Sequence, residues 1–193
     1  MSSKKQGASP INYVESDTPS TEKIEAFLLD SSIFSKDTPA ARSSYDASRF
    51  GELKGNKLVY SFVEALYLVE KEKMLVYSGK KLLDFDKLFN KIRKVEPNLL
   101  VRYTVFKDLR SRGYIVKTAL KFGADFRVYS KGIKPGEDHA KWVVYPVHEG
   151  NELTWYEFSA KNRVAHSTRK NLLIGIVDDE LDVTYYSIAW TRP

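Results

Sequence analysis

Three polar side chains in the second half of the sequence, Tyr129, His139 and Lys170, are candidates for acid–base chemistry. The imidazole of His139 can exchange a proton at neutral pH, because the ordinary pKa of histidine is about 6.5. Lys170 can direct a fixed positive charge at a phosphate, and Tyr129 can point into the same cleft. Each residue taken singly is more often structural than catalytic. The chemistry therefore depends on whether the three side chains converge.

Other kinds of active site lack their residues in this chain. The sequence has no cysteine, which excludes disulfides, thiolate metal sites and a cysteine nucleophile. Its three histidines, His139, His148 and His166, do not have the helical spacing of metal ligands. There is no glycine-rich phosphate loop, no nucleophile elbow and no cluster of carboxylates typical of a metal-dependent nuclease. Metal-free acid–base chemistry remains, and we expect no cofactor.

The charge of the chain favours a polyanionic partner. The formal net charge is +6, and basic residues are concentrated in the segment 107–134, where only two acidic residues occur. A solvated basic surface is the alternative explanation. The basic residues of this segment are Lys107, Arg110, Arg112, Lys117, Lys121, Arg127, Lys131 and Lys134.

The composition predicts a folded, soluble protein. Of the 193 residues, 42% are hydrophobic and 29% are charged, which is typical of globular proteins. No segment approaches the roughly 18 apolar residues of a membrane span. The basic segment 1–13 has no apolar stretch behind it, unlike a signal peptide. We therefore expect a cytoplasmic location.

The fold class predicted by apolar periodicity is α+β, with a small α+β N-terminal domain over residues 1–97. Ser61 and Glu64 have the spacing of a capping box, which predicts the start of a helix over 61–74. A second helix is predicted over 84–95, and short apolar segments lie at 24–29 and around Leu58 and Leu75. The polar segment near residues 30–50 reads as an inserted loop.

Residues 98–193 form the second predicted domain, a mixed β-sheet flanked by helices. A helix over 98–113 ends at Gly113. Further along, one more helix is predicted over 159–170, with Ser159 as its N-cap. The segments with strand periodicity, rich in β-branched and aromatic residues, are 114–120, 125–130, 141–148, 171–178 and 183–190.

Two segments together resemble a known catalytic domain. "FGADFRVYSKGIKPGEDHAKWVV" and "RVAHSTRKNLLIGIVD" are similar to the catalytic domain of archaeal tRNA-splicing (tRNA-intron) endonucleases. "VRYTVFKDLRSRGYIVKTALKFGADF" resembles the helix and strands that precede that site, and "GNKLVYSFVEALYLV" resembles a helix of the family's N-terminal domain. The resemblance covers residues 51–193 and implies an α/β, nuclease-like fold for the second domain.

The resemblance also implies a catalytic triad of Tyr129, His139 and Lys170. In this family the 2′-hydroxyl of a ribose attacks the neighbouring phosphorus without a metal ion, leaving a 2′,3′-cyclic phosphate and a 5′-hydroxyl. Tyr129 would take the 2′-hydroxyl proton, or orient that hydroxyl. His139 would protonate the departing oxygen, and Lys170 would stabilise the added negative charge. The implied substrate is precursor tRNA, cut at both exon–intron junctions in a bulge-helix-bulge.

RNA binding and self-association follow from the same resemblance. Arg163 matches a family arginine that stacks on a bulged base, and Tyr185 and Trp190 are candidates for the other side of that base. Two cuts at a fixed separation need two sites, so a single chain of this length implies self-association, as a homotetramer, or a partner chain. The acidic turn that would dock on a neighbouring subunit consists of Asp178, Asp179, Glu180 and Asp182.

Two alternatives remain at this stage. The chain could be a non-catalytic, RNA-binding structural subunit of a heteromeric splicing endonuclease. It could also be an unrelated RNA-binding module whose basic surface imitates the motif. The joint presence of all three triad residue types disfavours the first alternative, and the length of the resemblance disfavours the second.

Overall fold

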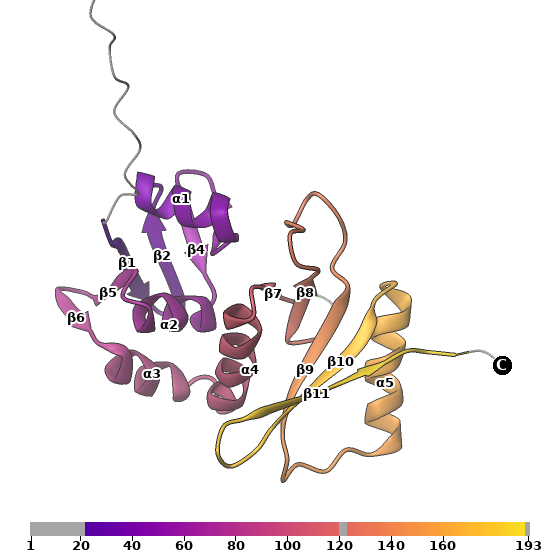
Figure 1. The fold of residues 1–193 in the computed structure, drawn as a ribbon. Helices are drawn as coiled ribbons and strands as arrows, with labels where there is room; N and C mark the ends of the chain where they lie inside the picture. Colours follow the sequence, from indigo (N-terminus) through magenta and orange to yellow (C-terminus); the bar gives the residue numbers. More distant parts are fainter. Residues whose placement is uncertain (1–21, 120–122, 192–193) are drawn as a thin grey trace, which may run out of the picture.

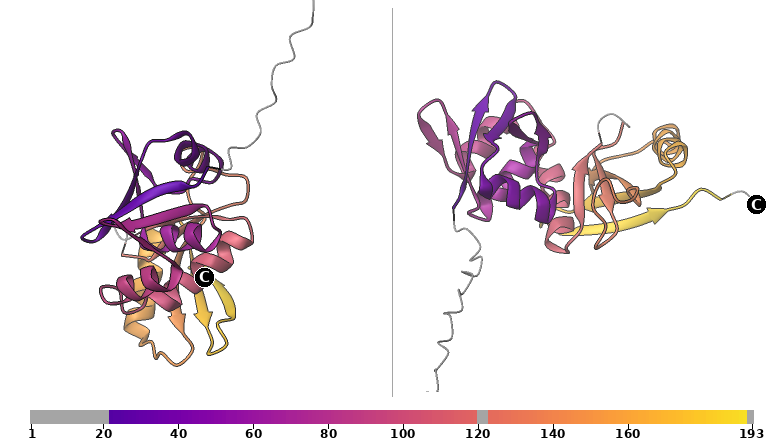
Figure 2. Two further views of the ribbon diagram at one scale, coloured as in Figure 1. Left: turned by 90° about the vertical axis from the view of Figure 1, so that its left-hand side faces the viewer. Right: turned by 90° about the horizontal axis from the view of Figure 1, so that it is seen from above.

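A computed structural model describes residues 22–119 and 123–191 and contains two β-sheets on either side of a central helix (Figure 1). The first sheet and its helices form one lobe, and the second sheet forms the other (Figure 2). Both sheets are mixed and both pack on helices, which confirms the predicted α+β class.

The first sheet has six strands in the order β3-β4-β2-β1-β5-β6. Strands β1 and β5 pair in parallel, and the other neighbours are antiparallel. Helix α2 begins with the predicted capping box of Ser61 and Glu64 and packs against β5. The elements of this part are β1 (Ile24–Leu29), β2 (Ser32–Lys36), α1 (Pro39–Ser48), β3 (Glu52–Lys54), β4 (Lys57–Tyr60), α2 (Phe62–Glu70), β5 (Met74–Ser78), β6 (Lys81–Leu83) and α3 (Phe85–Arg93).

The prediction of an inserted loop near residues 30–50 is wrong, because this segment forms β2 and α1. Strand β2 buries Ser35, whose hydroxyl lies 3.2 Å from that of Tyr60, so a polar residue occupies a core position. Helix α1 begins at a Thr38 cap followed by a proline, a favoured start. Only its alanines Ala40 and Ala41 are buried. A helix that buries so little apolar surface leaves almost no periodic signal in the sequence.

The second sheet has five strands in the order β11-β10-β9-β8-β7, with β9 and β10 parallel. Helix α5 packs on β10, and its start differs from the prediction: Thr154, not Ser159, is the N-cap. Thr154 and Glu157 form a capping box one turn earlier. The elements here are α4 (Leu99–Ser111), β7 (Ile115–Thr118), β8 (Phe126–Tyr129), β9 (Trp142–His148), α5 (Trp155–Ser167), β10 (Asn171–Val177) and β11 (Val183–Ile188).

Helix α4 connects the two sheets through a single hydrophobic core. Its residues Tyr103, Phe106 and Leu109 are buried together with side chains from the first sheet and from one face of the second. The opposite face of the second sheet packs against α5 in a smaller cluster. We propose that the boundary between the two domains lies near residue 97, in the turn between α3 and α4.

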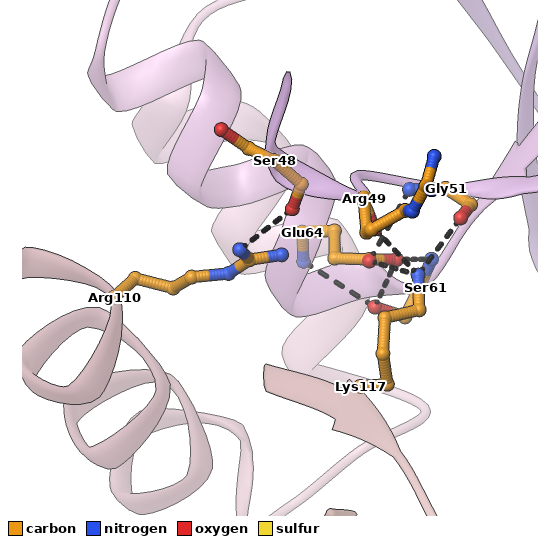
Figure 3. Close-up of polar contacts among 7 residues, drawn as sticks. All are labelled: Ser48, Arg49, Gly51, Ser61, Glu64, Arg110 and Lys117. Carbon is orange, nitrogen blue, oxygen red and sulfur yellow. Dashed lines mark hydrogen bonds and ion pairs between the residues drawn. The ribbon is translucent and has the colours of Figure 1, made fainter. Parts of the chain in front are cut away.

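A buried ionic network holds β7 and α4 to the first lobe (Figure 3). The ammonium of Lys117 donates to the carboxylate of Glu64 at 2.6 Å and to the carbonyl of Gly51 at 2.8 Å. Burial opposes ionisation of Glu64, but Lys117 and the hydrogen bonds outweigh it and lower the pKa of this carboxyl. Arg110 of α4 donates to the carbonyl of Ser48 at 2.8 Å. These contacts fix β7, the neighbour of β8, against the first lobe.

No helix among residues 22–119 and 123–191 combines the length and apolar character that crossing a membrane requires.

Candidate active site

The register of the second sheet brings three chain segments together at one end of its strands. Val128 pairs with Trp142 in an antiparallel ladder, and Trp142 pairs with Asn171 in a parallel one. The end of β8 therefore lies beside the starts of β9 and β10. Tyr129 is the last residue of β8. His139 lies shortly before β9, and Lys170 lies directly before β10. All three line one cavity of about 410 Å³.

Tyr129 is the last residue of β8 and is largely buried, with 4% of its surface exposed. Burial raises the pKa of its phenol, and the nearby guanidinium of Arg127 only partly opposes this shift. Tyr129 is therefore a neutral phenol at physiological pH. The direction of the shift is opposite to the one that would help the side chain act as a base.

His139 is presented by the loop between β8 and β9. Gly132 and Gly136 adopt positive φ values of 83° and 99° there, a backbone conformation that glycine tolerates. The backbone amide of His139 donates to the carboxylate of Asp138 at 2.6 Å, which fixes the chain just before β9. The imidazole itself is exposed to solvent at the cavity. It is therefore accessible to a bound ligand.

Lys170 lies in the tight turn between α5 and β10. Its amide donates to the carbonyl of Ala165 at 2.8 Å, and Arg169 has a left-handed φ of 55°. The ammonium donates to the carbonyl of Thr168 at 2.8 Å, which holds it at the cavity. Burial, and then repulsion from Arg127, lower the pKa of Lys170. The repulsion indicates that a second cation lies close to this ammonium.

Arg127 lines the same cavity, although in the sequence it stands out only as a member of the basic segment 107–134. Successive side chains of a strand point to opposite faces of a sheet. Arg127 is therefore on the face of Tyr129, while Phe126 and Val128 are fully buried on the other face. The two-residue spacing from Tyr129 was the signal that could have identified Arg127.

Arg163 lies apart from the cavity. It is exposed on α5 and is not among the residues that line the triad cavity. Of the two candidates for the other side of a bulged base, Tyr185 is half-buried and donates to Asp108 at 2.8 Å. Trp190 is 52% exposed, packs on the ring of His166 and lines a neighbouring cavity that also contains Lys170.

The acidic turn joins β10 to β11 and projects into solvent. The backbone amide of Asp182 donates to the carboxylate of Asp178 at 2.8 Å, and Leu181 has a left-handed φ of 67°. Asp179 and Glu180 are exposed, and Asp179 lies 3.2 Å from the imidazole of His148. The turn is thus a negatively charged projection whose backbone is held by a hydrogen bond between Asp182 and Asp178.

The cavity contains positive and negative groups, but it does not have the arrangement of a metal site. Both of its acidic residues engage the loop backbone: Glu137 accepts from the amide of Lys134 at 2.9 Å, and Asp138 accepts from His139. Over the described parts of the chain, no group of three or more His, Asp or Glu side chains is arranged to hold a metal ion.

Comparison with known proteins gives matches over nearly the whole described chain. Residues 24–89 match the model of the tRNA intron endonuclease N-terminal domain, and residues 99–185 match that of the tRNA intron endonuclease catalytic C-terminal domain.

Individual relatives are similar over most of their own length. A tRNA-splicing endonuclease of Thermococcus onnurineus is 42% identical over 89% of this chain and 98% of its own. One from Pyrococcus abyssi is 40% identical over 88% of this chain and 97% of its own. One from Nanoarchaeum equitans is 42% identical over 74% of this chain and 99% of its own.

Proposed function

Because the chain belongs to the tRNA intron endonuclease family, its activity is that of an RNA endonuclease in tRNA splicing, and we propose that it cuts precursor tRNA at both exon–intron junctions of a bulge-helix-bulge. The proposed catalytic residues are Tyr129, His139 and Lys170. The observation that carries this proposal is their convergence on one cavity from three separate chain segments.

The proposed reaction is a transesterification without a metal ion. The ribose 2′-oxygen loses its proton to the solvent and attacks the adjacent phosphorus, and the bond from phosphorus to the 5′-oxygen breaks. His139 gives a proton to the departing 5′-oxygen, and the ammonium of Lys170 stabilises the charge on the non-bridging oxygens. The products are a 2′,3′-cyclic phosphate and a 5′-hydroxyl.

A cleavage assay in EDTA tests this reaction. The purified chain is incubated with a precursor tRNA that carries a bulge-helix-bulge, and the fragment ends are analysed. We expect two cuts, at the exon–intron junctions, with cyclic phosphate on each upstream fragment. Loss of cleavage in EDTA, with recovery on adding Mg²⁺, would contradict the proposed chemistry.

We infer that Tyr129 orients the 2′-hydroxyl by a hydrogen bond, because the raised pKa of the phenol disfavours the phenolate. Tyr129→Phe is expected to lower kcat about tenfold, the value of roughly one hydrogen bond. The pH dependence of kcat should keep its wild-type shape. A loss of a thousandfold or more, together with a changed pH dependence, would instead identify Tyr129 as the general base.

Recognition of the RNA is proposed to use exposed planar side chains outside the cavity. RNA-binding proteins read unstacked bases in bulges by stacking, because the major groove of an A-form helix is too narrow. Arg163 and Trp190 are both exposed and suited to this contact, whereas the phenol of Tyr185 is engaged with Asp108.

Two cuts at a fixed separation require at least two active sites, and we propose that copies of the chain form a homotetramer. The acidic turn between β10 and β11 would dock on a basic surface of a neighbouring copy. Its exposed carboxylates, in a protein of net charge +6, supply the complementary charge.

Neutralising the turn tests this docking. The combined change Asp178→Asn, Asp179→Asn, Glu180→Gln and Asp182→Asn keeps the hydrogen-bond acceptors and removes the charge. We expect the mass measured by light scattering to fall from that of a tetramer to smaller species. The control neutralises Glu22, Glu25, Asp30 and Glu52, exposed acids of the first lobe, and should leave the mass unchanged. An unchanged mass in the turn variant would refute the docking.

A further inference from the structure

Arg127 is a cation that lines the triad cavity and forms no ion pair with a carboxylate of residues 22–119 or 123–191. It lies in β8, with β7 on one side and β9 on the other, so its position in the sheet is fixed by ladders on both sides. Its side chain is partly buried, and its Nε is fully buried with no hydrogen-bond partner among the described residues. Its contact with the ring of Tyr129 is distant, with the guanidinium carbon 6.0 Å from the ring centroid.

The neighbours of Arg127 make this position electrostatically unfavourable. Lys117 is directly opposite it in the ladder of β7 and β8 and is itself paired with Glu64, so this neighbour offers Arg127 no negative charge. Lys170 is close enough for Arg127 to depress its pKa. No carboxylate of the described chain forms an ion pair with Arg127, and both acidic residues of the cavity engage the loop backbone instead.

A buried polar or charged group without a partner costs folding free energy. Such groups persist where a ligand supplies the missing partner. The charge that Arg127 lacks is negative, and the guanidinium is suited to the non-bridging oxygens of a phosphate. The group that enters this cavity in the proposed reaction is a phosphodiester.

We propose that Arg127 is a fourth catalytic residue, whose guanidinium binds a non-bridging oxygen of the phosphodiester being cut, in the cavity that it shares with Lys170. The inference rests on the proposed function and adds a contact to it. During the attack of the 2′-oxygen, the phosphoryl group gains negative charge on its non-bridging oxygens. That charge is then stabilised by two fixed cations, Arg127 and Lys170, and not by Lys170 alone.

The first test compares Arg127→Met with Arg127→Lys in cleavage of precursor tRNA. We expect Arg127→Met to lower kcat about 100-fold, as removal of one preorganised donor does, and Arg127→Lys to retain more activity. Affinity for the RNA should change little, because one phosphate contact among several is lost. The control Arg42→Met removes an exposed arginine of α1 and should retain wild-type kcat. Equal kcat in Arg127→Met and wild type would overturn the proposal.

A stability measurement separates this role from a structural one. Arg127→Met removes an unpaired cation next to Lys117, so its melting temperature should equal or exceed that of the wild type. A melting temperature lowered by several degrees, together with lost activity, would mean that Arg127 supports the fold and would overturn the proposal.

A second test uses the alkaline limb of the pH–rate profile. It should move to higher pH in Arg127→Met if deprotonation of Lys170 causes that limb, because Arg127 lowers the pKa of Lys170.

A binding experiment tests the contact between Arg127 and the RNA without requiring cleavage. Precursor tRNA with 2′-deoxyribose at the cleavage positions lacks the attacking hydroxyl and cannot be cut by the proposed reaction. In ¹⁵N-arginine-labelled protein, the Nε–H signal that is missing from Arg127→Met identifies Arg127. This signal should shift when the RNA is added. A signal that stays in place with bound RNA would refute the contact, whereas a failure of the wild type to cut normal RNA would refute only the proposed function.

Discussion

His139→Ala is expected to lower kcat for cleavage of precursor tRNA by a factor of 10² to 10⁴, the usual contribution of a positioned general acid. The imidazole is exposed, and its backbone is fixed by Asp138 independently of the side chain, so the variant should fold normally. RNA binding should be retained, because the lost group acts on the leaving oxygen rather than on recognition. Single-turnover cleavage at saturating enzyme measures this effect directly.

The role of His139 as an acid can be separated from other roles by changing the leaving group. An RNA in which sulfur replaces the 5′-oxygen at the cleaved bond releases a thiolate, which does not need a proton to leave. His139→Ala should cut this RNA at a rate within about tenfold of the wild type. If the variant remains as deficient as on normal RNA, His139 does not act as the acid.

The control for this experiment is His148→Ala. His148 is at the other end of β9 and is not part of the triad cavity. Its replacement should leave the rates on both substrates within about twofold of the wild type. A similar loss in both histidine variants would point to a general effect on the protein.

The strands of the second sheet were predictable because they depend on local sequence. The β-branched and aromatic runs at 125–130, 141–148 and 171–178 contain β8, β9 and β10. Tyr129 lies near the end of one of these runs, and Lys170 lies directly before another. The positions of both residues relative to the strands could therefore also be predicted. Helix α1 could not, because its buried side chains are two alanines and its cap and polar residues are equally typical of a loop.

The partners of charged residues were not predictable, because they depend on contacts between distant segments. The sequence identifies Glu64 only as a capping residue, yet its carboxylate also binds Lys117, 53 positions away. Lys117 belongs to the basic segment that predicts a charged surface, although it is 5% exposed. The same limit applies to Arg127, which differs from its basic neighbours in sequence only through its position on the face of Tyr129.

Lys117→Met is expected to destabilise the protein by about 3–5 kcal/mol, the usual cost of removing one partner of a buried ion pair. Methionine has nearly the same length as lysine, so packing is largely kept. The loss arises because Glu64 stays buried without its cation, and the carbonyl of Gly51 loses a donor. Since this network joins β7 to the first lobe, the active-site sheet should also lose part of its support (Figure 3). Urea unfolding at neutral pH measures the change.

Lys107→Met is the matched control. Lys107 of α4 pairs with Glu70 of α2 at 2.6 Å, but 46% of its side chain is exposed. Solvent screens such a pair, and its loss should cost at most about 1 kcal/mol. Equal destabilisation by the two changes would show that burial of the Glu64–Lys117 pair is not the cause.

The pH dependence of this effect has a defined sign. The pKa of Glu64 is lowered in the folded protein, so its contribution to stability is complete above the ordinary glutamate value of about 4.3. That contribution is lost as the pH falls through the lowered, folded-state pKa. In Lys117→Met the main cause of the lowering is gone, so Glu64 binds a proton more readily in the folded state. The difference in unfolding free energy between wild type and variant should therefore be largest near pH 7 and shrink below pH ~4. A difference that stays constant from pH 7 to pH ~3 would assign the loss to packing instead of charge.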